Sequence, residues 1–452
     1  ISWAHPVWFD IRETDTLNAL EARSDKDDRH ICLAGGTLVL TSRSGYIPIE
    51  EVQIGDLVLT HKGRWMPVIG KRSNGIRKIV CIRAHGVADL RMTPDHQIWI
   101  RSCIGKGRWP GMNCGTSHHK FAAQKSDPEW LAAESVLGSY VNLKLPPIED
   151  SPLTKEEWWI IGRWLGDGHR GGHRRSGRRG GVGRFFISCA HGEVPALTER
   201  LGQYVGHIAT LTASQIALRD LRPEVRDVLS RCGNRAANKR LPGEAFALSP
   251  EKSEALLSGY LSADGHYNKT YDRWSASSIS RSLLLGMSMV AQRARGVVAS
   301  VYAGRPPRQG KILGRTVNMS QDWAFCFRNS IGHHQSGWIG IDGAWKKVRK
   351  ISEVDQAEVW DLSVAEDESF TAEGAIVKNC PLQIGVIERC IRLWSNPGET
   401  VLDPFAGIGS TGYVGLKHKR KFIGVELKPL YCEVSVRNLK SVENEEQVKM
   451  FA

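Results

Sequence analysis

Two aspartates stand at matching places in an internal near-repeat of the chain. The stretches IIGRWLGDGH (residues 160–169) and LLSGYLSADGH (residues 256–266) align so that Asp167 matches Asp264. Two carboxylates brought together repel each other unless a cation lies between them. Hard divalent ions such as Mg²⁺ favour oxygen ligands of this kind. The repeat therefore predicts a pair of acids that binds Mg²⁺.

Each aspartate follows a run with helical periodicity, so the two helices must position the acids. Small residues recur four positions apart in both runs, at Gly162 and Gly166 and again at Gly259 and Ala263. Residues four apart lie on one face of a helix, and small ones let two backbones approach closely. Helices packed by these faces would bring the two aspartates together at their ends. An Asp-Gly turn after a helix is common, but the matched second copy favours a functional role.

The two stretches resemble the paired motifs of LAGLIDADG homing endonucleases, and the resemblance covers roughly residues 151–330. It implies an enzyme that cuts double-stranded DNA with metal ions at Asp167 and Asp264. The text NKRLP, shortly before the second motif, resembles a lysine-containing element of that family and implies a catalytic role for Lys239. The implied form is a pseudo-symmetric monomer.

The charge of the chain fits a polyanionic partner. The net charge is +13 and the pI is about 9.3. A soluble basic protein would show the same bulk values, but one block of sequence is more specific. Glycine-spaced arginines without an intervening acid are typical of a phosphate-binding loop. We expect DNA contacts from Arg170, Arg174, Arg175, Arg178, Arg179 and Arg184.

A second set of reactive residues lies outside this repeat. A strand-like run ends at the pair Asn379-Cys380, and an unrelated glycine-rich segment begins just after it. An alternating, β-rich pattern opens at Cys32, and the text LRMTPDHQIWI places Thr93 and His96 between two apolar runs. Each of these residues alone is ordinary, because a lone histidine in a strand is usually structural.

Taken together, these residues closely resemble an intein, a self-splicing insertion with a Hint fold, of 348 residues from Cys32 to Asn379. The resemblance implies that the Cys32 thiol attacks the carbonyl of the preceding residue, which suits the strongest nucleophile available at neutral pH. His96 would be the proton donor to the scissile nitrogen, Thr93 would hold the bond in place, and Asp361 would assist proton movements.

The resemblance also implies the later steps. Cys380 would take over the N-terminal segment from the thioester, and Asn379 would cyclise through its side-chain amide and release the insertion. No cofactor is implied for splicing. Two positions depart from the family pattern: Lys378 and Glu368 stand where histidines that assist Asn379 normally occur. These departures bear on the rate of cleavage after Asn379.

The segment after the insertion contains VLDPFAGIGSTG, between an expected buried strand at 400–402 and a helix from about residue 411. Glycines in such a turn allow a ligand to approach the backbone, as in Rossmann-like sites. The text KFIGVELKPLY then puts an acid at the end of a second strand, where it could hold ribose hydroxyls. The cofactor-binding residues predicted here are Asp403, Phe405, Gly407, Gly409 and Glu426.

This pairing resembles the S-adenosylmethionine site of DNA methyltransferases that modify exocyclic amines, of the N6-adenine or N4-cytosine type. Joining the flanks, residues 1–31 and 380–452, gives continuous text of 104 residues. The D/N-P-P-Y/F motif that holds the flipped base in that family is absent. In the order seen with phage-type members it would precede Ile1, so we expect an N-terminally truncated chain that does not methylate DNA by itself.

The predicted fold class is multidomain: an all-β Hint splicing domain, an α/β LAGLIDADG domain, and a split α/β Rossmann-like methyltransferase fragment. No run of eighteen apolar residues and no secretory signal occurs, and the ten cysteines lack a disulfide-framework spacing. A cytoplasmic protein with free thiols and no membrane partner is expected. The predicted segments are 1–31, 32–150 (Hint, first part), 151–330 (endonuclease), 331–379 (Hint, second part) and 380–452.

Two alternative functions remain open from the sequence. The chain could be a DNA endonuclease whose Hint part no longer splices, or a Hint module that cleaves itself without ligation. The DNA target, the choice between adenine and cytosine, and the present activity of the endonuclease are not specified by the sequence.

Overall fold

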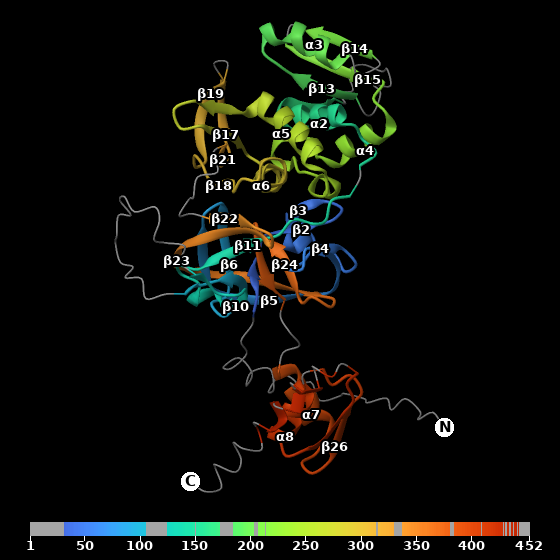
Figure 1. Ribbon diagram of the computed structural model, residues 1–452, viewed down its shortest axis with the longest axis vertical. Coiled ribbons are helices and arrows are strands. Elements are labelled where there is room, and N and C mark those ends of the chain that lie inside the picture. Colours follow the sequence, from blue (N-terminus) through green and yellow to red (C-terminus); the bar gives the residue numbers. More distant parts are fainter. Residues whose placement is uncertain are drawn as a thin grey trace. The chain divides into compact units, whose positions relative to one another are not determined.

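The computed structural model of the chain describes residues 31–104, 124–149, 151–171, 184–202, 207–212, 214–312, 315–329, 337–379 and 384–427 except residue 408, with scattered residues up to Val442. The chain divides into two compact units (Figure 1). One unit is His30–Asn379, and the other combines Ile1–Arg29 with Cys380–Ala452. The expectation of a multidomain chain is confirmed, and the structure is largely β-rich.

The N-terminal and C-terminal segments of the first unit together form a β-rich part, in which blue and orange strands lie side by side in Figure 1. Its main sheet follows the order β1-β6-β5-β4-β2-β24-β25-β7-β11-β23-β22, with β3 on β2 and β10 on β7. The strands are β1 (Leu33–Ala34), β2 (Leu38–Thr41), β3 (Gly45–Pro48), β4 (Leu57–Leu59), β5 (Trp65–Ala84), β6 (Val87–Met92), β7 (Gln97–Arg101), β10 (Glu129–Ala132), β11 (Tyr140–Leu143), β22 (Gly337–Gly340), β23 (Gly343–Val364), β24 (Ser369–Ala372) and β25 (Ala375–Lys378). A separate small pair joins β8 (Cys103–Ile104) to β9 (Gln124–Lys125).

Two long strands tie the ends of this unit together. The 20-residue β5 and the 22-residue β23 pair antiparallel over most of their length, with several register shifts. Such irregularities bend and twist a strand, which lets one ribbon serve both edges of a curled sheet. Gly55 and Gly63 lie in turns and Gly45 begins β3 directly after a turn, and the three glycines have positive φ angles of 96°, 78° and 66°.

An α/β part occupies the middle of the same unit and contains two halves of equal topology. The first half is α2 (Lys155–Asp167), α3 (Val194–Gly202), α4 (Pro223–Arg231) and a sheet of order β12-β13-β15-β14. The second is α5 (Pro250–Asp264), α6 (Arg281–Arg295) and a sheet of order β16-β17-β21-β18. In each sheet the first, second, fourth and third strands are neighbours, so the sequence repeat is also a repeat of the fold.

The strands of the first half are β12 (Gly168–Gly171), β13 (Arg184–Ser188), β14 (His207–Thr212) and β15 (Gln215–Arg219). Those of the second half are β16 (His266–Asn268), β17 (Arg273–Ser278), β18 (Ser300–Ala303) and β21 (Trp323–Arg328), with a hairpin of β19 (Arg308–Ile312) and β20 (Arg315–Met319) between the last two.

Helices α2 and α5 pack against each other through their glycines. A Cβ atom on Gly162 would overlap the carbonyl oxygen of Leu256, and one on Gly259 would overlap that of Trp159. The predicted close approach of the two helices is therefore present. Thr154 begins α2 with a full capping box, in which its side chain accepts from the Glu157 amide.

The second unit contains α7 (Ile384–Trp394), β26 (Thr400–Asp403), α8 (Ser410–Lys417) and β27 (Lys421–Gly424). Strands β26 and β27 pair in parallel. The prediction that the strand after residue 399 is buried is wrong, because Leu402 is 63% exposed and Ile423 on its partner is 54% exposed. An apolar strand is buried only when a further layer covers it, and this two-stranded sheet has helices on one side only among the described residues. No helix within the described residues is long and apolar enough to cross a membrane.

Candidate functional sites

Cys32 lies fully buried immediately before β1. Its backbone N–H donates to the Thr93 Oγ1 atom at 3.1 Å, and the Thr93 N–H donates to the Cys32 carbonyl at 3.0 Å. These reciprocal bonds continue the register that pairs Leu33 with Met92. Thr93 thus holds the nitrogen of the Ile31–Cys32 peptide bond, as the resemblance implied.

The His96 ring is fully buried in the turn after Thr93. Burial lowers the pKa of His96 to about 3, while the Cys32 backbone acts to raise it. Neither ring nitrogen forms a hydrogen bond of normal geometry. The ring is therefore neutral at ordinary pH and lies against the Cys32 backbone.

Two further residues surround Cys32. The Asn74 side-chain amide donates to the Cys32 Sγ atom at 3.0 Å. Strand β1 also pairs with β23 so that Leu33 faces Trp360, and the same register brings Asp361 opposite Cys32. The sequence predicted Asp361 but missed Asn74, whose Ser-Asn-Gly context signals only a turn within β5.

Asn379 is buried at the end of β25 and is held by two backbone groups. Its backbone N–H donates to the Glu368 carbonyl at 2.9 Å. Its side-chain nitrogen donates to the same carbonyl at 2.6 Å, and its side-chain oxygen accepts from the Val364 N–H at 3.0 Å. The two ends of the amide are assigned by this pattern, because the opposite orientation leaves both facing like groups.

The two ends of the unit converge on shared strands. Strand β25 pairs with β7 at Val377 and Ile98, and continuing this antiparallel register puts Asn379 opposite His96. On β23, Val364 follows Asp361 by three residues, about 10 Å along a strand. Cys380 lies outside the described residues.

The positions that depart from the intein pattern have other partners. Glu368 has a positive φ of 47°, and its contribution to Asn379 is its carbonyl. Lys378 lies over the Trp130 ring, with its Nζ atom 5.9 Å from the ring centre.

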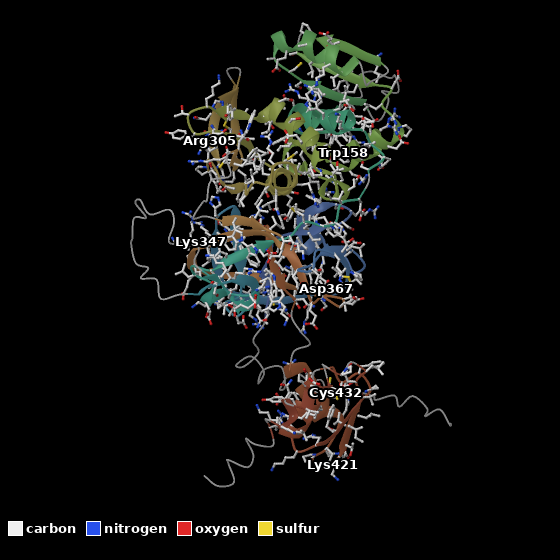
Figure 2. All side chains as sticks on the ribbon, viewed as in Figure 1. Trp158, Arg305, Lys347, Asp367, Lys421 and Cys432 are labelled. Carbon is white, nitrogen blue, oxygen red and sulfur yellow. The ribbon has the colours of Figure 1, made fainter. Side chains whose placement is uncertain are left out.

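Asp367 anchors the turn that carries Glu368 (Figure 2). Its fully buried carboxylate pairs with Arg64 at 2.6 Å and Lys62 at 2.8 Å, and accepts from Thr60 at 2.7 Å. Burial acts to raise the pKa of Asp367, but the hydrogen bonds from these three residues outweigh it and hold the pKa well below its usual range. These bonds fix the turn that carries Glu368 against the turn between β4 and β5.

Asp167 and Asp264 end α2 and α5, and the structure brings them together. Burial, and next the charge of Asp167, raise the pKa of Asp264 to about 6. The pKa of Asp167 is also raised, first by burial. Two acids whose charges oppose each other in this way fit a bound cation.

Two cations lie at this acid pair. Lys239 is buried, and its Nζ donates to the carbonyls of Gly166 at 2.7 Å and Trp164 at 3.3 Å; burial lowers the pKa of Lys239 to about 8. Arg163, which the sequence reading missed, pairs with Asp167 at 3.1 Å. Its position one turn before Asp167 on α2 is a detectable signal, since residues four apart on a helix are neighbours.

A divalent ion fits this pair as one that keeps several water ligands. Among the described residues, no group of three or more His, Cys, Asp or Glu side chains could hold a metal. Magnesium bound through one or two carboxylates with water completing the shell needs no third side chain. The acid pair is thus compatible with Mg²⁺ and unsuited to an all-protein cage.

Of the six predicted DNA-binding arginines, the structure describes two. Arg170 on β12 pairs with Phe185, and the backbone of Arg184 on β13 pairs with Gly171, so the two arginines belong to adjacent pairs of one register. The Arg170 N–H donates to the Asn234 side chain at 3.0 Å. Arg174, Arg175, Arg178 and Arg179 lie outside the described residues.

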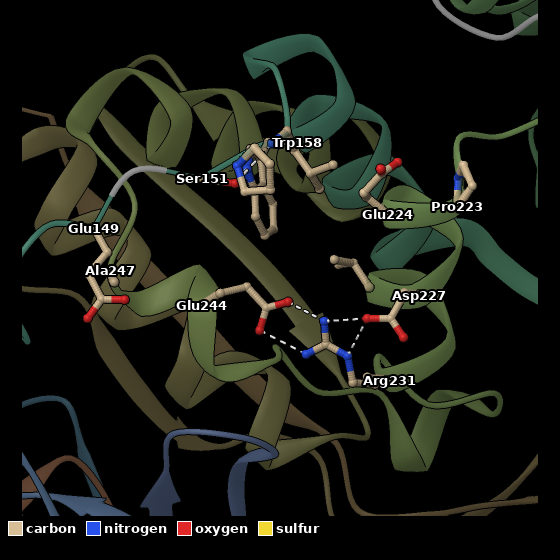
Figure 3. A pocket seen from close by; sticks show the side chains of 12 residues that line it. Glu149, Ser151, Trp158, Pro223, Glu224, Asp227, Arg231, Glu244 and Ala247 are labelled. Carbon is tan, nitrogen blue, oxygen red and sulfur yellow. Dashed lines mark hydrogen bonds and ion pairs between the residues drawn. The ribbon is translucent and has the colours of Figure 1, made fainter.

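A hollow of about 480 Å³ lies at the other end of α2, where its lining includes Ser151 and Trp158 (Figure 3). Arg231 in its wall is already paired with Asp227 at 2.8 Å and with Glu244. Trp158 precedes Asp167 by nine residues, about 13 Å along a helix. The hollow is therefore separate from the acid pair.

In the second unit, the glycine-rich loop joins β26 to α8. Gly407 and Gly409 have positive φ angles of 54° and 84°, and α8 begins directly after Gly409. The Glu426 carboxylate accepts from the Gly407 N–H at 2.9 Å, and the Asp403 carboxylate accepts from the Phe405 N–H at 3.0 Å. Phe405 is 88% exposed. The loop therefore presents backbone, two carboxylates and an aromatic ring, a set that fits a nucleoside cofactor.

Comparison with known proteins agrees with this last site. Residues 319–437 match the family model described as DNA methylase, of the N6/N4 type. An orphan methyltransferase, M.BamHII of Bacillus amyloliquefaciens, is 42% identical over 133 residues, which are 28% of this chain and 49% of the relative. The type II methyltransferase M.Cfr9I of Citrobacter freundii is 25% identical over 46% of this chain and 60% of its own length. The chain carries an N6/N4 DNA methyltransferase segment.

A different kind of relative covers more of the chain. The ATP-dependent DNA helicase Hel308 of Thermococcus kodakarensis is 23% identical over an alignment of 433 positions, gaps included, which covers 77% of this chain and 36% of the helicase. A solved structure of a mutant Ssp DnaB mini-intein matches 77% of this chain and 99% of its own length at 9% identity, with a low TM-score of 0.27. The chain spans between about a third and three fifths of the length of these three curated relatives.

Proposed function

We propose that residues 32–379 excise themselves by protein splicing and join Ile31 to Cys380. The observation that supports this most directly is the convergence of Cys32 and Asn379 on one set of strands. Cys32 is bonded to Thr93, and the β7 register brings Asn379 opposite His96. Splicing joins the residues on the two sides of the segment, so its first and last residues must lie close together. The shared strands bring Cys32 and Asn379 to the same part of the sheet. The division of the chain between residues 379 and 380 coincides with the second proposed junction, and the division between residues 29 and 30 lies two residues before the first.

The proposed chemistry uses the groups around Cys32 first. The Cys32 sulfur attacks the Ile31 carbonyl carbon and forms a thioester as the carbon–nitrogen bond breaks, and the released Cys32 amine gains a proton. His96, buried and neutral against that backbone, would supply the proton donor. The Cys380 thiol then displaces the Cys32 thiol from the thioester.

The second half of the proposed reaction begins at Asn379. Its side-chain nitrogen attacks its own main-chain carbonyl carbon, a five-membered imide forms, and the bond to Cys380 breaks. A sulfur-to-nitrogen shift then leaves a peptide bond between Ile31 and Cys380.

Intact mass spectrometry of the freshly expressed chain, followed over time, tests splicing. A ligated product of 104 residues beside a free segment of 348 residues is the expected result. Unligated fragments alone would replace the proposal with self-cleavage by a Hint module. A persistent 50.2 kDa chain would leave an arrested precursor whose activity is that of the endonuclease.

A second activity is supported by the acid pair. We propose that residues 151–330 form a LAGLIDADG endonuclease that cuts double-stranded DNA with Mg²⁺ held by Asp167 and Asp264. The duplicated topology and the raised pKa of Asp264 support it. Cleavage of DNA that carries the uninterrupted host sequence is the assay, and cutting that survives the double change of Asp167 and Asp264 to Asn would remove these acids from the site.

The flanks are proposed to form part of a DNA methyltransferase after splicing. S-adenosylmethionine would supply a methyl group there, and the loop of Asp403, Phe405, Gly407 and Gly409 with Glu426 would hold it. Calorimetric titration of the spliced 104-residue product with S-adenosylmethionine tests binding, and Glu426→Ala is the matched change.

A further inference from the structure

The Glu368 carbonyl controls where Asn379 points. Both the backbone N–H and the side-chain nitrogen of Asn379 donate to it, at 2.9 Å and 2.6 Å. For cyclisation, the side-chain nitrogen must leave this carbonyl and reach the Asn379 main-chain carbon. The position of the Glu368 carbonyl therefore bears on both the resting orientation and the release of the nucleophile.

A histidine from a distant part of the sequence holds the next residue. His61, in the turn between β4 and β5, places its Nδ1 atom 2.7 Å from the Ser369 Oγ atom. Its backbone N–H also donates to that oxygen, at 3.2 Å. Ser369 is fully buried, is bonded covalently to Glu368, and pairs with Lys378 across β24 and β25. His61 thus fixes the strand end from which the Glu368 carbonyl projects.

Aromatic rings fix His61 in turn. The ring centres of Trp99 and Trp130 lie 5.3 Å and 5.6 Å from that of His61. Trp130 also lies under Lys378, the residue next to Asn379. His61 and Lys378 therefore both contact Trp130, beside the end of β25.

The direction of the His61–Ser369 hydrogen bond depends on protonation. In the neutral ring with its proton on Nε2, the Nδ1 atom accepts from the Ser369 hydroxyl, while the hydroxyl oxygen accepts from the His61 backbone N–H. A protonated ring has a hydrogen on Nδ1 as well, and the serine proton must then find another acceptor. Protonation therefore reverses the hydrogen bond between the two side chains and removes the Nδ1 acceptor of the Ser369 hydroxyl.

We propose that His61 is a positioning residue for Asn379 cyclisation, acting through Ser369 and the Glu368 carbonyl, and that its neutral form is the competent one. The proposal rests on the proposed splicing function. His61 does not touch the reacting atoms: the bond formed joins the Asn379 side-chain nitrogen to its own carbonyl carbon, and the bond broken is that to Cys380. The side-chain nitrogen loses a proton and the Cys380 amine gains one, so no further reactant is needed.

Charged groups around His61 agree with a neutral ring. Burial lowers the pKa of His61, and Lys62, Lys144 and Arg64 lower it further, whereas Asp367 raises it. The net effect on the pKa of His61 is a decrease, so the ring stays neutral at pH values where an ordinary histidine begins to gain a proton. Competence should then be lost as the pH falls through that lowered pKa.

The test isolates C-terminal cleavage in the Cys32→Ala chain, which cannot form the thioester. Release of residues 380–452 is measured by mass spectrometry between pH 4.5 and 8. The parent is expected to slow as the pH falls. His61→Asn keeps an acceptor for the serine proton but has no titration, so its rate should lie near the parent's at pH 8 and stay level at lower pH. His61→Ala should be slower by about tenfold at pH 8, the effect of losing one hydrogen bond of about 1.4 kcal/mol.

Folding is checked by thiol-induced cleavage after Ile31 in the Asn379→Ala chain, which His61→Ala should leave unchanged. If His61→Ala fails this check, the pH profile of His61→Asn decides instead. Release that keeps the parent's rate and pH profile in both variants overturns the role of His61 alone. Absence of release from the parent overturns the proposed function and this role with it.

Discussion

The two ends of the 348-residue segment are built differently around the same strands. At Cys32, the contacts come from side chains: Thr93 accepts from the Cys32 backbone nitrogen, Asn74 donates to the sulfur, and the buried His96 ring lies against the Cys32 backbone. At Asn379, the backbone carbonyl of Glu368 holds the residue, and side chains act only one step away. The difference teaches that a β scaffold can position a reacting residue through main-chain groups when the usual side chains are absent.

The largest expected effect breaks one junction and spares the other. Cys32→Ala removes the only nucleophile at the first junction, so cleavage after Ile31 and ligation should disappear entirely. Cleavage after Asn379 should persist, because that step needs no thioester. Product masses after expression at 25 °C measure both. Ligated product from this variant would contradict the proposed mechanism.

The next effect tests the unpartnered histidine. His96→Ala should slow thiol-induced cleavage after Ile31 by about a hundredfold or more, the usual contribution of general acid–base catalysis. Because the pKa of His96 is lowered to about 3, the ring stays neutral at higher pH, and no step from its titration is expected between pH 5 and 8. The assay uses the Asn379→Ala chain over that pH range.

The control for this change is His85→Ala, another histidine of the β-rich part, whose ring contacts Ser300 at 3.1 Å. It should keep the parent's rate. Equal losses in the two variants would point to general destabilisation instead of a role in proton transfer.

A smaller effect would make the second junction resemble the first. Lys378→His restores a side chain that can transfer protons beside Asn379, and we expect cleavage there to accelerate by about tenfold. Lys378→Gln removes the charge without adding an imidazole and should stay near the parent's rate. Release of residues 380–452 from the Cys32→Ala chain is the measurement. An equal gain in both variants would assign the effect to lost charge near Trp130.

The smallest effect is a change in the stability of the fold at the acid pair, which should leave the reactions at both junctions unchanged. The pKa of Asp264 is raised to about 6, so its ionisation destabilises the fold as the pH rises from about 4 to 6. Near pH 4, Asp264→Asn should therefore have about the same free energy of unfolding as the parent. At pH 7.5 without divalent ions, its free energy of unfolding should be higher by roughly 1–3 kcal/mol.

Urea denaturation in EDTA measures this difference, and added Mg²⁺ should stabilise the parent alone. Splicing should continue in the variant at the parent's rate. A stability difference that does not change with pH would contradict the raised pKa.

The parts of these sites that could be predicted share a local signal. Thr93 and His96 stand three residues apart in one turn, and Asp167 and Asp264 each close a glycine-spaced helix. Asn74 and His61 could not be found this way. Asn74 reaches Cys32 only because β5 pairs with β23, and His61 reaches Ser369 across 308 residues of chain. Contacts made by sheet topology leave no spacing pattern in the sequence.

The same reasoning explains the error at β26. Its apolar alternation predicted a buried strand, yet burial depends on layers that other segments supply. Thr400–Asp403 pairs only with β27 in the described structure, so Val401 packs against the helices while Leu402 on the other face stays exposed. The apolar residues of a strand indicate that it can pack against another layer, but they do not indicate which segment forms that layer.

The closeness of Cys32 and Asn379 also has a consequence for where such a segment can reside. An inserted sequence whose two ends lie far apart would force its host chain to separate at the insertion point. Here both ends meet one short stretch of β23, so the host needs only a gap comparable to an ordinary surface loop. A segment with this geometry could move between unrelated proteins with little demand on their folds, and grafting residues 32–379 into a loop of a fluorescent protein would measure that tolerance.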